Sequence, residues 1–133
     1  MGTAVRPIRV LCVDDNVDAA TSCAEFLSLV GFDAKAAYGP LEALAVAEEF
    51  RPHACLLDIN MPQMSGYELA PRLRELVGPV LLIAVTAAAG EEHRRRLELA
   101  AFDLALTKPA DPWAFVEPIT RHVPLARLDQ DET

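Results

Sequence analysis

The chain has 133 residues, of which 52% are hydrophobic and 24% are charged, and its formal net charge is −8 at pH 7. This length suits one domain with a single core, and the composition excludes a disordered chain. The negative charge argues against general nucleic-acid binding, because the one dense basic run, at residues 94–96, is short enough to be a solvated helix face.

Short hydrophobic segments alternate with longer amphipathic ones along the chain. A short hydrophobic run that ends at a turn or capping residue indicates a strand, whereas hydrophobic residues three and four positions apart indicate a helix. The first, third and fourth predicted strands are almost entirely hydrophobic, as expected of central parallel strands covered on both faces. The predicted strands are residues 8–13, 33–37, 53–57, 80–85 and 104–107.

The sequence predicts five helices, one after each strand. The third begins with a capping box formed by Ser65 and Glu68, and Asp111 is the expected N-cap of the fifth. Pro71 and Pro118 fall inside the third and fifth helices, where we expect kinks or early ends. The residues expected to face the core are, in chain order, Cys23, Phe26, Leu27 and Val30; Leu41, Leu44 and Ala47; Leu69, Leu73 and Leu76; Leu97, Ala100 and Ala101; and Val116, Ile119 and Val123.

Five strand–helix pairs predict an α/β fold with an open, doubly wound, five-stranded parallel sheet. In such a sheet ligands bind at the carboxyl ends of the strands, beside the point where the strand order reverses. Four of the five predicted strands are followed by polar residues, which are Asp14 and Asp15, Asp58, Thr86 and Lys108. Taken singly, each has an ordinary alternative, since the aspartates or Thr86 could cap a helix and Lys108 could be a solvated loop residue. Their convergence at one edge predicts a functional site.

Three carboxylates at one edge repel each other, and one lysine cannot neutralise all of them. Oxygen ligands without Cys or His indicate a hard cation, and a shallow site with room for water and phosphate suits Mg²⁺ better than Ca²⁺. The alternative is a structural cluster that the lysine neutralises.

An aspartate is also a competent nucleophile toward phosphorus. Asp58 stands alone at its strand end and is the expected phosphoacceptor, with Asp15 as a direct metal ligand. Asp14 would act through water or orient the site. Lys108 would pair with one phosphoryl oxygen, and the Thr86 hydroxyl would donate a hydrogen bond to another.

These residues lie in the motifs VDDN, LLDINMPQMSG, AVTA and LTKP, which together resemble the receiver domain of two-component response regulators over nearly the whole chain. The resemblance implies a flavodoxin-like fold with strand order 2-1-3-4-5. It implies that Asp58 accepts a phosphoryl group from a histidine kinase or a histidine phosphotransfer protein. It also implies that Mg²⁺ is held by Asp15, Asp58 and the backbone carbonyl of Asn60, and that the Lys108–Pro109 bond is cis.

One position departs from the family pattern. Receivers usually carry Tyr, Phe or His three residues before the lysine, and here that residue is Ala105, so the usual aromatic rotamer switch is unavailable. Phe102 either substitutes for it or packs the end of the fourth helix. We expect phosphorylation to move the loop after the fourth strand through Thr86, and so to change the face formed by the fourth helix, fifth strand and fifth helix. Trp113 is either part of that output face or ordinarily packed.

The cysteines and the domain limits complete the prediction. Cys12, Cys23 and Cys55 lie in hydrophobic segments without zinc-type spacing, so we expect reduced core residues in a cytoplasmic protein. No hydrophobic run reaches the length of a membrane span, and we expect no direct contact with nucleic acid. A receiver domain is predicted at residues 6–124, with a short acidic tail at 125–133.

Without an output domain after the fifth helix, we expect a single-domain response regulator whose downstream target is a protein. It would catalyse only the phosphorylation and dephosphorylation of its own aspartate. The alternatives are a receiver cut from a hybrid histidine kinase and a relay intermediate. A phosphohydrolase similar to haloacid dehalogenases is a weaker alternative, because Asn60 stands where those enzymes carry a second aspartate as general acid.

Overall fold

A five-stranded parallel sheet forms the centre of the protein, in the order β2-β1-β3-β4-β5. The computed structural model describes residues 7–87 and 89–123. The predicted fold class and strand order are confirmed, and the predictions at 33–37 and 104–107 have the observed bounds. The strands are β1 (Arg9–Val13), β2 (Asp33–Ala37), β3 (Ala54–Asp58), β4 (Leu81–Thr86) and β5 (Leu104–Thr107).

A helix follows each strand, as predicted. Among the described residues, no helix is long and apolar enough to cross a membrane. The predicted domain limits at residues 6 and 124, and the predicted acidic tail at 125–133, lie outside the described residues. The helices are α1 (Val17–Leu29), α2 (Pro40–Phe50), α3 (Gly66–Val77), α4 (Glu91–Leu99) and α5 (Trp113–His122).

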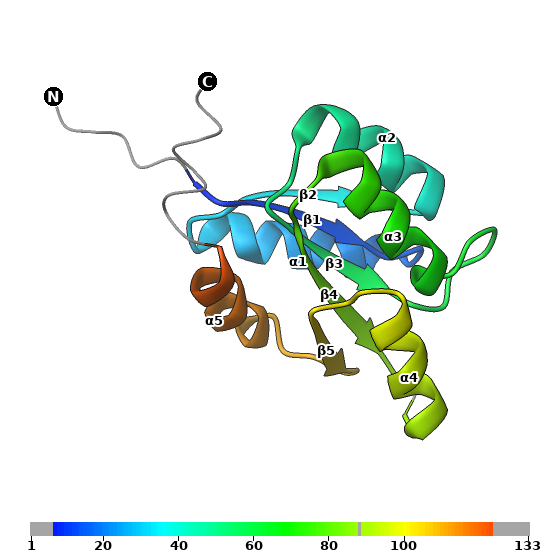
Figure 1. Ribbon diagram of the computed structural model, residues 1–133. Helices are drawn as coiled ribbons and strands as arrows, with labels where there is room; N and C mark the ends of the chain where they lie inside the picture. The colour runs from blue at the N-terminus through cyan, green and yellow to red at the C-terminus, as the bar shows by residue number, and fades with distance from the viewer. Residues whose placement is uncertain (1–6, 88, 124–133) are drawn as a thin grey trace, which may run out of the picture.

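Two helical layers cover the sheet, with α1 and α5 on one face and α2 and α3 on the other (Figure 1). Successive side chains of a strand point to opposite faces, so β3 contributes to both cores. Cys55 and Leu57 pack on the α2–α3 side, and Ala54 and Leu56 pack on the α1–α5 side. All four are buried, which explains why this strand reads as a continuous hydrophobic run.

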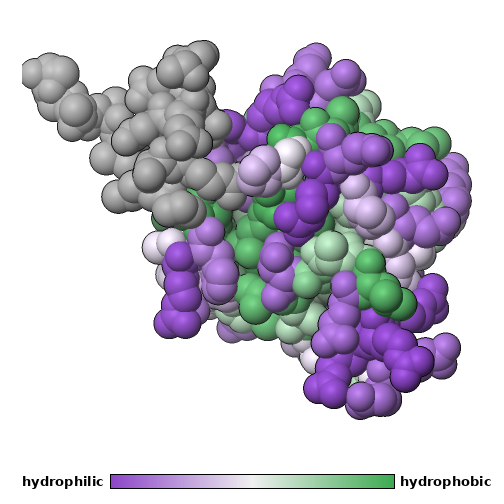
Figure 2. Space-filling view, in the orientation of Figure 1, coloured by the Kyte–Doolittle hydropathy of each residue, from purple (hydrophilic) through white to green (hydrophobic). Residues whose placement is uncertain are grey.

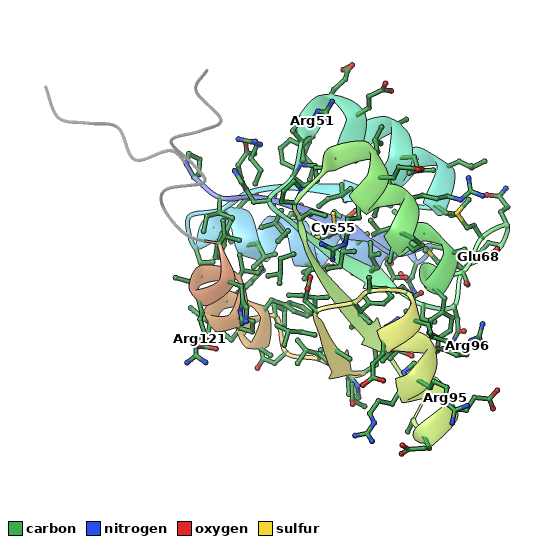
Figure 3. All side chains as sticks on the ribbon, in the orientation of Figure 1. Arg51, Cys55, Glu68, Arg95, Arg96 and Arg121 are labelled. Carbon is green, nitrogen blue, oxygen red and sulfur yellow. The ribbon has the colours of Figure 1, made fainter. Side chains whose placement is uncertain are left out.

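Helix α4 buries little of its surface. Leu97 packs against Ile59 and Ala84, while the basic run at 94–96 is exposed. Figure 2 shows hydrophilic side chains gathered over this helix, and in Figure 3 Arg95 extends outward from it. The Arg96 guanidinium lies over the Tyr67 ring of α3, with its Cζ 4.1 Å from the ring centroid. The basic run is therefore mainly a solvated helix face, as expected from the sequence.

Several predicted core positions are wrong. Leu41 and Val30 are 59% and 37% exposed, and Ala101 is exposed beyond the end of α4 with a φ of 65°. In α1 and α2 small side chains largely face the sheet, because a helix packs close to a strand where alanines line the contact, and the larger residues lie to one side. The buried alanines of these two helices are Ala20, Ala24, Ala43 and Ala47.

The capping box at the start of α3 is confirmed, with the Glu68 carboxylate accepting a hydrogen bond from the Ser65 backbone N–H. The expected early ends at prolines are wrong. Pro71 and Pro118 both lie inside helices that continue past them. Burial of the flanking residues outweighs the hydrogen bond that each proline removes.

The start of α5 agrees with the predicted cap. The helix is assigned from Trp113, and Pro112 before it already has a helical conformation, with φ −55° and ψ −28°. Asp111 performs the predicted capping, because its Oδ1 accepts a hydrogen bond from the Trp113 N–H at 3.0 Å and its carbonyl accepts one from the Ala114 N–H at 2.8 Å.

Candidate functional site

Three carboxylates meet at the carboxyl edge of β1 and β3. These strands are neighbours in the sheet, so Asp14 and Asp15, directly after β1, lie beside Asp58, the last residue of β3. One carboxylate oxygen from each residue lies within 4.8 Å of the others. Asp58 is 6% exposed, Asp14 is half-buried and Asp15 is exposed. The expected convergence of the three acids is confirmed.

Lys108 reaches this cluster from the loop after β5. Its Nζ lies 3.1 Å from Oδ1 of Asp58 and 3.4 Å from Oδ2 of Asp14. Its backbone N–H donates to the Thr86 carbonyl at 2.9 Å, and the Lys108–Pro109 bond is cis, as the resemblance implies. The alternative that Lys108 is a solvated loop residue is therefore wrong.

The helix-capping alternatives are also wrong. The N-cap of α1 is Asn16, whose Oδ1 accepts a hydrogen bond from the Ala19 N–H at 3.0 Å. Asp14 accepts a hydrogen bond from the Asn16 N–H at 2.9 Å, and the N-cap of α4 is Gly90 rather than Thr86. Because Asn16 caps the helix, both aspartates before it are available to the site. This role of Asn16 was not predicted from the sequence, although Asn is among the favoured N-cap residues.

Burial and charge shift the pKa values of the central pair. Burial raises the pKa of Asp58, and the negative charge of Asp14 raises it further. Hydrogen bonds from Lys108 and from the Asn60 backbone lower it, but the pKa remains above its ordinary value overall. Burial lowers the pKa of Lys108, but its hydrogen bond with Asp58 and the charges of Asp58 and Asp14 raise it above its ordinary value overall. Lys108 is therefore a cation at neutral pH.

Gly66 lets the loop after β3 fold back onto the end of that strand. A Cβ at this position would lie 2.7 Å from the Asp58 backbone oxygen and 2.9 Å from the Ile59 Cα. The Gly66 N–H donates to the Ile59 carbonyl at 2.8 Å. This role of Gly66 was not predicted from the sequence, where a glycine directly after the predicted cap Ser65 was the available signal.

The donor set fits a hard divalent cation. Three carboxylates and one lysine carry three negative charges and one positive charge, which leaves a net charge of −2 for a cation to neutralise. All three candidate side-chain ligands are oxygens, which is the preference of Mg²⁺ and Ca²⁺ rather than of Zn²⁺. Asn60, two residues after Asp58, is exposed on the same loop.

The remaining predicted residues belong to β4, to β5 and to the segment before β5. Thr86 ends β4 and is 3% exposed. Ala105 of the edge strand β5 is exposed and stands opposite Ala84. Phe102 packs with Leu97 at the end of α4, which favours the packing alternative over a substitute switch.

Trp113 is partly packed and partly exposed. Its ring contacts Phe26 of α1 edge-on, with centroids 4.9 Å apart, and the residue is 61% exposed. The contact supports the packing alternative, although it leaves most of the residue at the surface.

Comparisons with known proteins agree with this geometry. A family model described as the response regulator receiver domain matches residues 10–120. The chain is 38% identical over 109 residues to the transcriptional regulatory protein PrrA of Mycobacterium leprae, covering 82% of this chain and 47% of that protein. It is 31% identical over 122 residues to the sensor histidine kinase RcsC of Escherichia coli K12, covering 92% of this chain and 13% of that protein. The chain thus spans about half of the one relative's length and a smaller part of the other's.

A solved structure shows the same architecture. A CheY-like response regulator receiver domain protein from Methanospirillum hungatei superposes with a TM-score of 0.81 at 28% identity, covering 94% of this chain and 98% of that one.

Proposed function

The chain belongs to the response regulator receiver domain family, and we propose that it is a phosphoacceptor switch in which Asp58 receives a phosphoryl group from a phosphohistidine. The donor would be a histidine kinase or a histidine phosphotransfer protein. The chain is a signalling module rather than a classical enzyme. The reactions that it catalyses would act on its own side chain, namely phosphorylation of Asp58 and later hydrolysis.

The position of Lys108 carries this proposal. Its ammonium bridges Asp58 and Asp14, at 3.1 and 3.4 Å, inside a cluster that still has a net negative charge. A structural ion pair would need one carboxylate, whereas this site holds three at the edge where doubly wound sheets bind ligands. The excess of acids supports a site that works with a cation and an incoming phosphoryl group.

In the transfer itself, an Asp58 carboxylate oxygen attacks phosphorus. The O–P bond forms as the P–N bond of the donor breaks, and its electron pair leaves on the imidazole nitrogen. Lys108 orients the carboxylate before transfer and pairs with a phosphoryl oxygen afterwards. The Thr86 hydroxyl donates to a second phosphoryl oxygen.

The acidic cluster would hold Mg²⁺, which when bound supplies neutralisation of the phosphoryl charge. Asp15, Asp58 and the backbone carbonyl of Asn60 are the proposed direct ligands, and Asp14 acts through water or orients the site. Of the two aspartates after β1, Asp14 already accepts hydrogen bonds from Lys108 and from the Asn16 N–H. These contacts support an indirect role for Asp14 and a direct metal-ligand role for Asp15.

The output would travel through the end of β4. Thr86 is buried there, and its carbonyl accepts the Lys108 N–H, so movement of either residue is transmitted to the α4–β5–α5 face. Ala105 leaves that face without the usual aromatic side chain. Amide NMR shifts should change around residues 87 and 89–90 when a phosphoryl mimic binds, and unchanged shifts there would contradict this route.

The similarity fits two kinds of protein in which this receiver domain could work. Its relatives include a transcriptional regulatory protein and a sensor histidine kinase, so both a free response regulator and a receiver joined to a kinase are compatible with the similarity. We favour a protein target at the α4–β5–α5 face. Free thiols at all three cysteines are compatible with a cytoplasmic location.

Incubation with acetyl phosphate and Mg²⁺, followed by intact mass measurement, tests the proposal. The wild type should gain one phosphoryl group, and Asp58→Asn should gain none. Asp33→Asn is the matched control, because it removes an exposed carboxylate at the opposite end of the sheet and should be labelled like the wild type. A labelled Asp58→Asn protein would overturn the assignment.

A further inference from the structure

Two of the three cysteines face each other across the contact between β1 and α1. The Cys12 thiol donates a hydrogen bond to the Cys23 sulfur, with the two Sγ atoms 3.7 Å apart. Both residues belong to the hydrophobic core between the sheet and the α1–α5 layer. The sequence predicted two core residues here, and the fold pairs them.

A cavity connects this pair to the phosphoacceptor site. Its volume is about 320 Å³, and it is lined by both thiols together with Asp14, Asp58 and Lys108. Cys12 is buried and Cys23 is half-buried. A small oxidant therefore has a route to the sulfur atoms that close packing would otherwise deny.

The two thiols are chemically unequal. The hydrogen bond from Cys12 lowers the pKa of the Cys23 thiol, and this outweighs burial and the Asp14 charge, which both raise it. The thiolate is the reactive form of cysteine, so Cys23 is the nucleophile of the pair.

Cys55 provides an internal reference for this reactivity. It belongs to β3 on the other face of the sheet, where Figure 3 shows it in the interior of the molecule. It is fully buried, and burial raises the pKa of its thiol to about 12. We therefore expect Cys55 to be inert under conditions in which Cys23 reacts.

We propose that Cys12 and Cys23 form a redox-active dithiol, which a peroxide converts to a disulfide beside the phosphoacceptor site. The Cys23 thiolate attacks one peroxide oxygen, the O–O bond breaks, and the product is a Cys23 sulfenic acid. The Cys12 sulfur then attacks the Cys23 sulfur, the S–S bond forms and the S–O bond breaks. For hydrogen peroxide, two thiols and one peroxide give one disulfide and two waters, so the sulfurs lose two electrons and the peroxide gains them.

To form the bond, the two sulfur atoms must approach from 3.7 Å to about 2.05 Å. It would tie β1 to α1 and constrain the unfolded chain between the two residues, so the oxidised protein should melt at a higher temperature than the reduced one. The proposal does not depend on phosphoryl transfer.

The test treats the wild-type chain with hydrogen peroxide in small molar excess, removes the peroxide, and labels free thiols with N-ethylmaleimide after denaturation. We expect a loss of two hydrogens and labelling of one cysteine, Cys55, where the reduced protein is labelled at all three. Trypsin releases residues 10–35 as one fragment that carries both Cys12 and Cys23. Cleavage before Asp14 should then separate the two cysteines only after dithiothreitol treatment.

Variants assign the roles. Cys55→Ser should oxidise like the wild type, whereas Cys23→Ser should not react at the same dose. Cys12→Ser should stop at a Cys23 sulfenic acid that dimedone traps. Three labelled thiols in the treated wild type, a bond between two chains, or oxidation of Cys55 at the same dose would each overturn the proposal. A lower melting temperature after oxidation would also overturn it, because the bond would then distort the fold.

Discussion

Neutralising Asp58, the proposed phosphoacceptor, should stabilise the metal-free fold. In an Asp58→Asn variant, the amide oxygen can still accept the Lys108 hydrogen bond, but a charge at a residue that is only 6% exposed disappears. Burial raises the pKa of Asp58, so the folded state binds its proton more tightly than the unfolded chain does. Stability is therefore lost as pH rises through the raised pKa, and the ionised carboxylate destabilises the fold above it.

The magnitude follows from the distances. At an effective dielectric constant of about 20, attraction to Lys108 at 3.1 Å is about 5 kcal/mol, and repulsion from Asp14 at up to 4.8 Å is at least about 3 kcal/mol. Lys108 is 36% exposed, so solvent weakens its attraction and the two effects nearly cancel. Desolvation of the carboxylate remains. We expect the free energy of unfolding of Asp58→Asn to exceed that of the wild type by about 1–2 kcal/mol. For a chain of this size, this raises the melting temperature by about 3–8 °C.

Magnesium should reduce the difference in stability between Asp58→Asn and the wild type. A ligand that binds only the folded state stabilises it by about 2.7 kcal/mol at a concentration of about 100 times its Kd. The variant lacks one of the three carboxylates, so it should gain less than the wild type at the same Mg²⁺ concentration. Thermal melts in EDTA and in Mg²⁺, followed by circular dichroism, measure both effects. Asp33→Asn should match the wild type in each buffer, because Asp33 is an exposed residue at the other end of the sheet.

Two results would refute this reasoning. A lower melting temperature of Asp58→Asn in EDTA would mean that the ion pair with Lys108 outweighs the burial of the carboxylate. An equal Mg²⁺ response in Asp58→Asn and the wild type would mean that this carboxylate is not a metal ligand.

Three further predictions concern the proposed metal-binding aspartates, a buried thiol and a glycine. In a Mg²⁺ titration, Asp15→Asn should weaken binding more than Asp14→Asn does. Equal losses of Mg²⁺ affinity would show that the direct role of Asp15 and the indirect role of Asp14 are wrongly divided. Burial raises the pKa of the Cys55 thiol from 9.0 to about 12, so the folded state keeps this proton to a higher pH than the unfolded chain does. As pH rises from 9 to 12, the free energy of unfolding of the wild type should therefore fall by up to about 4 kcal/mol relative to that of Cys55→Ala. Urea unfolding of both proteins at several alkaline pH values measures this, and parallel curves would contradict it. Gly66→Ala should lower the free energy of unfolding by about 1–3 kcal/mol, because its Cβ would meet a backbone oxygen at 2.7 Å. Gly39→Ala is the control in the same assay, because a Cβ there would meet no atom of the described residues within 4 Å, so it should not show this steric loss.

The sequence alone was sufficient for the fold class and for the edge at which the site lies. Strands β2 and β5 were predicted with their observed bounds, because hydrophobic runs and turn residues are local signals. The meeting of the acids at the carboxyl ends of β1 and β3 follows from the same signals, since parallel neighbouring strands end at one edge. The absence of an aromatic residue at Ala105 was also visible in the sequence.

The tertiary structure decided which of these residues contact each other and which faces are buried. Leu41 is hydrophobic yet exposed, because the distance between a helix and the sheet selects small residues for the contact. Lys108 meets Asp14 across 94 positions of sequence, and Cys12 faces Cys23 only because α1 packs back on β1. Propensity and capping depend on neighbours within a turn or two, whereas contacts between distant side chains depend on strand register and helix docking. Residue types and their order could therefore be predicted, while their pairing required the fold.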